Sequence, residues 1–123
     1  MQLDIRSQGL DISQGLRGQI ERRLRFVLGR FVNRVSRVTV HLADLNGPRG
    51  GIDKRCRVVV RLLRSGQVFV EDVDADLEAV VDRATDRVRQ SVRRVLERRR
   101  ERRGRWQNGE DMPAGDPEAR DTG

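Results

Sequence analysis

The chain has 123 residues and carries 26 Lys and Arg against 19 Asp and Glu, a net charge of +7 at neutral pH. That length is typical of one domain, and so basic a balance favours a polyanionic partner, nucleic acid ahead of membrane. No apolar run approaches the ~20 residues of a membrane helix, and the N-terminus lacks the layout of a secretory signal. The single cysteine, Cys56, excludes an internal disulfide and a cysteine-based zinc site, so we expect a cytoplasmic protein.

Charge divides the chain into a basic body and a short acidic tail. Residues 105–123 hold two arginines against five acids, a net charge of −3, which leaves +10 on residues 1–104. Beyond Gly104 the chain is polar and has little to bury. We therefore expect one domain at 1–103 and a disordered acidic tail at 104–123.

The first 32 residues indicate a strand followed by a helix. Residues 1–6 alternate, with Leu3 and Ile5 on one side, which predicts a short half-buried strand. Ser13 can cap the helix predicted over 14–32. Apolar residues recur in that helix at steps of three and four, and its outer face is basic.

Alternation predicts three further strands in the middle of the chain. The predicted strands cover 35–43, 54–63 and the residues around Val68 and Val70. The glycine-rich segment 44–51 is predicted to be a loop. Ser65-Gly66 marks a hairpin turn between the last two strands.

A long helix is predicted from about Asp76 to about Arg102, with an apolar stripe at helical spacing. Its charges are polarised, since residues 74–86 carry a net −4, whereas residues 87–103 hold nine arginines and carry a net +7. Acids at the start and bases at the end suit the helix dipole. The dipole accounts for the direction of this gradient but not for nine arginines.

Together these elements predict an α+β fold in the order β-α-β-β-β-α. Each strand has one apolar face and each helix has one apolar stripe. A four-stranded, mostly antiparallel sheet with two helices packed on one face buries all of them in one core. About 100 residues suffice for such a core without a metal or disulfide.

The concentration of arginine on two helix faces favours nucleic-acid binding, because the planar guanidinium can bind phosphate oxygens with two hydrogen bonds. The alternative is that these are ordinary solvated charges. Tyr is absent, and the aromatic residues are three Phe and one Trp. With so few aromatics, contact through phosphates and shape is favoured over the reading of splayed bases.

Other motifs in the chain favour structure over chemistry. The acidic run 71–76, aligned as a calcium loop, would need Gly at Leu77 and Glu at Arg83, so acids entering a helix explain it better. His41 and Cys56 have no identifiable catalytic partner, and Cys56 is in the buried register of its strand. We therefore expect no enzyme, no metal, no cofactor and no small-molecule substrate.

The segment NGPRGG matches neither common glycine-rich phosphate-binding motif. It is most simply a flexible connection between two strands. A loop that approaches RNA, with Arg49 and Lys54 at its edges, is the alternative.

Two segments resemble the ribosome hibernation-promoting factor and ribosome-associated inhibitor family, also known as sigma-54 modulation proteins. They are MQLDIRSQGLDISQGLR at the N-terminus and DADLEAVVDRATDRVRQSVRR in the last helix. The resemblance covers about residues 1–100 and implies the same β-α-β-β-β-α fold. It also implies binding to rRNA of the small ribosomal subunit, in the channel for mRNA and tRNA, where members silence translation without chemistry. About 20 residues follow the helix, so we expect no ribosome-dimerisation domain.

The resemblance also implies specific rRNA-binding residues. Arg23, Arg87, Arg94 and Arg98 match usual basic positions of the family, and Phe26 stands where a second helix-one base is frequent. Arg22, Arg83, Arg89 and Lys54 are expected to assist. Two other functions stay open: a general RNA- or DNA-binding module acting away from ribosomes, and a regulator that binds an acidic protein.

Overall fold

The computed structural model describes residues 1–45, 53–64 and 66–107, with side chains as far as residue 98. The elements are β1 (Gln2–Gln8), α1 (Gln14–Leu28), the 3-10 helix η1 (Gly29–Arg34), β2 (Val35–Asp44), β3 (Lys54–Leu62), β4 (Gly66–Asp74) and α2 (Leu77–Gln107). This order confirms the predicted α+β fold.

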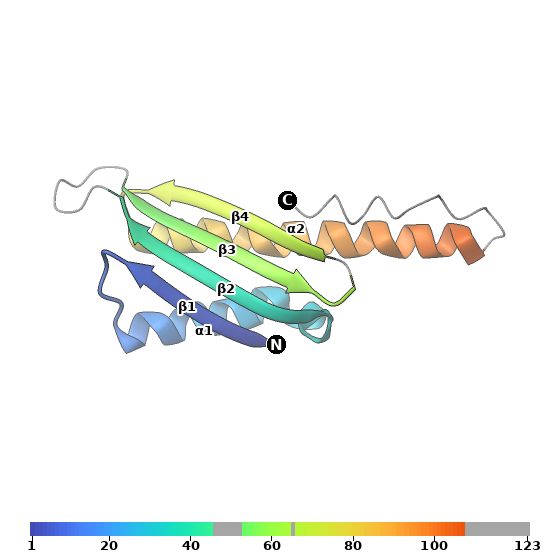
Figure 1. Ribbon diagram of the computed structural model, residues 1–123, viewed down its shortest axis with the longest axis horizontal. Coiled ribbons are helices and arrows are strands. Elements are labelled where there is room, and N and C mark those ends of the chain that lie inside the picture. The colour runs from blue at the N-terminus through green and yellow to red at the C-terminus, as the bar shows by residue number, and fades with distance from the viewer. Residues whose placement is uncertain (46–52, 65, 108–123) are drawn as a thin grey trace.

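The four strands form one sheet in the order β1-β2-β3-β4. β1 runs parallel to β2, whereas β2–β3 and β3–β4 are antiparallel. The parallel pair requires a crossover connection, which α1 supplies. In Figure 1 the strands lie in front of both helices, so the two helices cover one face and the other face is open.

Alternate strand residues and the inner stripes of both helices form a single core. The strands contribute Val38, Val40, Leu42, Cys56, Val58, Val60, Leu62, Val68 and Val70. The helices contribute Ile20, Leu24, Val27, Leu28, Val80, Val81, Ala84, Val88, Val92, Val95 and Leu96. One contiguous cluster confirms that both helices pack on the same face of the sheet.

Helix α1 begins as predicted and ends earlier than predicted. The Leu16 N–H donates to the Ser13 Oγ over 3.1 Å, which confirms the predicted cap. The α-helix stops at Leu28, where the Gly29 N–H donates to the Arg25 carbonyl, and residues 29–34 continue as a 3-10 helix. The prediction of one helix over 14–32 was wrong in this last turn, because Gly29 permits the change of backbone while Phe31 still packs on the core.

Helix α2 is longer than predicted. The Glu78 N–H donates to Asp76 Oδ1 over 3.1 Å, so Asp76 caps the helix start. The helix continues through Gly104 to Gln107 and projects past the end of the sheet (Figure 1). A single glycine costs a helix about 1 kcal/mol relative to alanine, too little to end it among strong helix formers. The rest of the predicted tail, 108–123, lies outside the described residues.

The turn between β3 and β4 joins two paired residues, Leu62 and Gly66. Gly66 has a φ of 80° and Arg64 a φ of 67°, so the left-handed positions lie on either side of Ser65, which is outside the described residues. The glycine-rich segment between β2 and β3 falls within 46–52 and is also outside them. No helix in the described residues is long and apolar enough to cross a membrane.

Candidate nucleic-acid interface

The outer surface of the two helices carries most of the arginines predicted to bind RNA. Arg22 on α1 and Arg89, Arg93 and Arg94 on α2 are exposed. Within the part of the chain that the structure describes, no ion pair or hydrogen bond engages the guanidinium of Arg22, Arg89 or Arg94. The guanidinium groups of these three side chains are therefore available to bind an anionic ligand.

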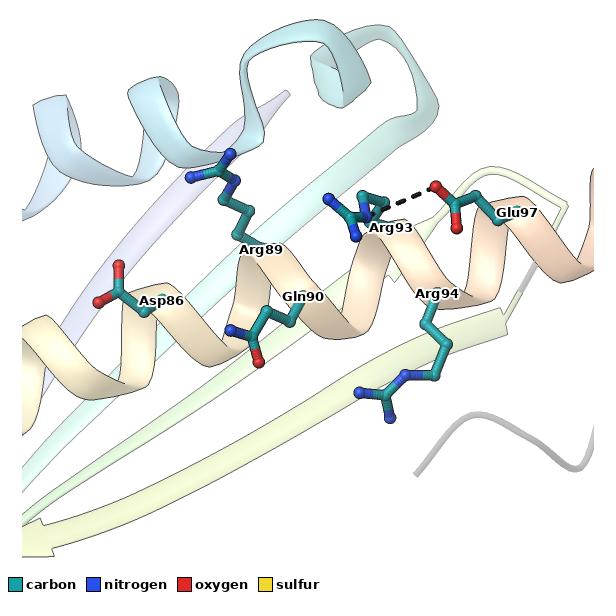
Figure 2. Close-up of a pocket in the computed structure, with 6 residues that line it drawn as sticks. All are labelled: Asp86, Arg89, Gln90, Arg93, Arg94 and Glu97. Atoms are coloured by element: carbon teal, nitrogen blue, oxygen red, sulfur yellow. Dashed lines mark ion pairs between the residues drawn. The ribbon is translucent and has the colours of Figure 1, made fainter.

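Figure 2 shows how the arginines of α2 are distributed around a shallow hollow in its surface. The hollow is lined by Asp86, Arg89, Gln90, Arg93, Arg94 and Glu97. Arg89 is directed towards α1, whereas Arg94 leaves the helix on the opposite side. The two residues are five positions apart, which places them about 140° apart around the helix axis. The surface is therefore broad and open, and suits an extended polyanion better than a small anion.

Arg23, the first predicted contact, is engaged between the helices. Its Nε donates to Thr85 Oγ1 over 2.8 Å, and its terminal nitrogens lie 3.4 Å from Asp82 and 3.5 Å from Asp86. All three partners belong to α2. Arg23 therefore joins α1 to α2, and its charge is largely balanced by carboxylates.

Arg83 and Arg87 tie α2 to the last strand. Arg83 lies 3.0 Å from Asp72 and 2.7 Å from Asp74, and Arg87 donates to the Glu71 carbonyl over 2.6 Å. The hydrogen bond from Arg83 lowers the pKa of Asp72. The pKa of Asp74 is lowered first by the Asp76 N–H and then by Arg83. The acidic run 71–76 thus holds the helix start and engages Arg83 and Arg87, two of the predicted RNA contacts.

Lys54 is held at the start of β3. Its Nζ lies 2.9 Å from Asp53 Oδ1 and 3.5 Å from Asp44 Oδ2, and its side chain is 20% exposed. The hydrogen bond to Asp53 raises the pKa of Lys54. The alternative in which Arg49 and Lys54 present a loop to RNA concerns a segment outside the described residues, but Lys54 itself is bound within the protein.

Arg98 is half-buried and already interacts within the protein. The structure therefore brings Arg22, Arg89 and Arg94 to the open surface, and engages Arg23, Arg83, Arg87, Arg98 and Lys54 internally. An engaged arginine can exchange its partner for a phosphate only at the cost of the contact that it already makes.

Charge counting missed an apolar part of this surface. Phe26 is 82% exposed and lines a hollow between α1 and α2 with Arg89 and Arg93. Arg30 packs over the Phe31 ring in the same hollow, 5.1 Å from its centroid. The signal was present in the sequence, because Phe26 falls outside the apolar stripe of its helix.

The two other residues considered for chemistry, Cys56 and His41, lie on β3 and β2. Cys56 is buried, and burial raises the pKa of its thiol to about 12. His41 is half-buried on the open face of the sheet, opposite Val40 and Leu42. In the described segments, no group of three or more potential metal ligands converges.

Comparison with known proteins identifies relatives of this fold. The family model described as sigma 54 modulation protein / S30EA ribosomal protein matches residues 3–100. The N-terminal domain of Protein Y from Thermus thermophilus is 31% identical, with a TM-score of 0.62 over 76% of this chain and 98% of that one. A ribosomal subunit interface protein from Coxiella burnetii has a TM-score of 0.66 at 18% identity, over 79% of this chain and 99% of that one. No curated protein sequence matches.

Proposed function

Because the chain belongs to the sigma 54 modulation protein / S30EA ribosomal protein family, its role is tied to the ribosome, and we propose that it is a translation inhibitor. In this proposal it binds rRNA of the small subunit in the channel for mRNA and tRNA. It silences or protects idle ribosomes in the cytoplasm. The protein acts by occupying space, so it needs no cofactor and catalyses no reaction.

The observation that carries the proposal is the set of exposed, unengaged arginines on the helix surface, Arg22, Arg89 and Arg94. Asp82 and Asp86 pair with Arg23, and Asp72 and Asp74 pair with Arg83, so the negative charge of these carboxylates is partly balanced within the protein. A guanidinium in this setting can bind a phosphate with two hydrogen bonds. Arg93, whose exposed pair with Glu97 spans 3.5 Å, is a fourth contact, since such pairs are weak.

Phosphate contacts make binding dependent on salt, because each neutralised phosphate releases counterions. Four contacts give a slope of about −3 to −4 in a plot of log affinity against log salt. A folded protein that blocks the channel excludes mRNA and tRNA sterically, so inhibition follows occupancy.

The direct test is sedimentation of the purified protein with small subunits and with intact ribosomes, at low and high salt. We expect co-migration with the small subunit that is lost at high salt and lost when tRNA and mRNA fill the channel. If the protein still co-migrated when tRNA and mRNA filled the channel, its binding site would lie outside the channel. Binding to free duplex RNA as tight as binding to subunits would favour a general RNA-binding module instead.

A further inference from the structure

The face of the sheet turned away from the helices, called here the open face, carries an ordered array of outward side chains. Strand pairing aligns Arg6, His41, Arg57 and Glu71 in one row across the four strands. The neighbouring rows are Gln8, Ala43, Arg55 and Val73 on one side, and Asp4, Thr39, Val59 and Phe69 on the other. A shallow groove crosses all four strands here, and Arg6, His41, Arg55, Arg57, Val59 and Phe69 line it.

Positive charge in this groove exceeds what the protein neutralises. Arg57 forms an ion pair with Glu71. Asp4 forms an ion pair with Arg37, which lies in the next row. Glu71 and Asp4 are the carboxylates that face outward in these three rows. No acid among the described residues pairs with Arg6 or Arg55, so the positive charges of these two guanidinium groups at the groove are not balanced by a carboxylate.

Arg55 adds a specific sign of an unfilled contact. Its Nε is buried and has no hydrogen-bond acceptor within the described residues. Leaving a charged donor desolvated and unpaired is unfavourable, so native structures normally supply a partner. Rotation of the Arg55 side chain towards an oxygen in the groove would satisfy this donor.

The groove also contains an aromatic ring, one row from Arg57 and two rows from Arg55. Phe69 is 45% exposed although it lies in the middle of β4, and Val59 pairs with it across the strands. An aromatic ring beside arginines on a sheet is the arrangement with which proteins stack a base and bind its phosphates. The polar side chain of Gln8, in the same row as Arg55, can hydrogen-bond ribose or base.

We propose that the open face is a second RNA-binding surface, which takes a short single-stranded segment with its phosphates at Arg6 and Arg55 and one base on Phe69. The inference rests on the proposed function in its choice of RNA as the polyanion. It places RNA on both sides of the protein, since the first surface lies on the helices. A protein wedged within a channel walled by RNA would use both.

The test is fluorescence anisotropy of a labelled single-stranded uridine oligonucleotide of about 12 nucleotides, a length within the range of known single-strand sites. We expect Arg6→Gln with Arg55→Gln to weaken binding at least about tenfold. Phe69→Ala should weaken it about fivefold or more, and Phe69→Tyr should retain it. The matched control is Arg34→Gln with Arg64→Gln, which removes two exposed arginines outside the groove.

Each outcome decides the inference. If the groove variant and the control lost the same affinity for the oligonucleotide, the attraction would be diffuse and the inference would be overturned. Polyglutamate that competes as effectively as unlabelled RNA would also overturn it. Cross-linking of 4-thiouridine RNA to the unmodified chain should label β3 and β4, and labelling confined to α2 would overturn the proposal without depending on any variant's folding. If the protein bound the oligonucleotide but did not sediment with small subunits, the proposed function would be refuted and the inference about the open face would stand.

Discussion

The Nε of Arg23 donates to Thr85 Oγ1 over 2.8 Å, a hydrogen bond between residues 62 positions apart in the chain. Thr85 is buried, and its Oγ1 lies 3.0 Å from the Val81 carbonyl, so the hydroxyl is fixed against its own helix. Arg23 reaches it from α1 and also approaches Asp82 and Asp86. A residue that the family resemblance marks as an RNA contact is thus a link between the two helices.

Substitution of Arg23 should lower the stability of the fold, whereas substitution of its neighbour Arg22 should not. Arg23→Ala removes a hydrogen bond to a buried hydroxyl and two ion pairs, so the free energy of unfolding should fall by about 1 kcal/mol. Arg22→Ala changes an exposed position and should alter it by less than about 0.5 kcal/mol. Urea unfolding measures both, and equal losses would contradict the structural role of Arg23.

Removing arginines from the helix surface should change the salt dependence of subunit binding. Arg89→Gln with Arg94→Gln deletes two phosphate contacts, so the log–log slope should become less steep by about two. Arg34→Gln with Arg64→Gln is the matched control, since both arginines are exposed and lie outside the two α-helices. A slope unchanged by the double variant would show that these two side chains do not contact phosphates.

The ion pairs of Arg83 should give stability a characteristic response to acid. Arg83 helps to lower the pKa values of Asp72 and Asp74. A lowered carboxyl pKa contributes stability that is complete above the ordinary value of 3.8 and is lost as the pH falls through the lowered one. Arg83→Gln should therefore be less stable than the parent at pH 7, and the gap should narrow below about pH 4.

Urea unfolding at a series of pH values measures that gap. Arg93→Gln is a suitable control, because its partner Glu97 is an exposed helix neighbour. A gap that stays constant down to acid pH would mean that Arg83 stabilises the fold through packing of its side chain and not through the two carboxylates.

The thiol of Cys56 should be unreactive in the folded protein. Burial, followed by the negative charge of Asp72, raises its pKa to about 12. Thiolate is the nucleophile, so labelling by an aromatic disulfide at pH 8 should be slow and should accelerate in urea as the protein unfolds. Fast labelling of the native protein would contradict the burial of Cys56.

The fold was predictable because burial leaves a periodic trace in the sequence. Val38, Val40 and Leu42 alternate with polar residues, and all three are buried in the core. Gly29 was less informative, since the apolar spacing continues to Phe31 although the backbone changes to a 3-10 helix. Periodicity reports which side chains are buried and not which hydrogen-bond pattern the backbone uses.

The candidate site was less predictable because a charge gains or loses its availability through partners that the fold supplies. Arg83 meets Asp72 across 11 positions and Arg23 meets Thr85 across 62. Neither distance corresponds to a helix or strand repeat, so no local pattern marks these pairs. Exposed Arg22, Arg89 and Arg94 have the same composition signal as the engaged arginines, and only the tertiary structure distinguishes them.

The length of α2 has a consequence for how the protein meets a partner. Its 31 residues span about 46 Å, whereas a strand of nine residues spans about 30 Å. Leu96 is the last residue that the helix contributes to the described core, and the helix continues for eleven residues beyond it. Residues 97–107 hold six arginines against two glutamates. In the proposed binding to rRNA, this basic end of α2 would extend the protein's capture radius and orient the domain during diffusional encounter.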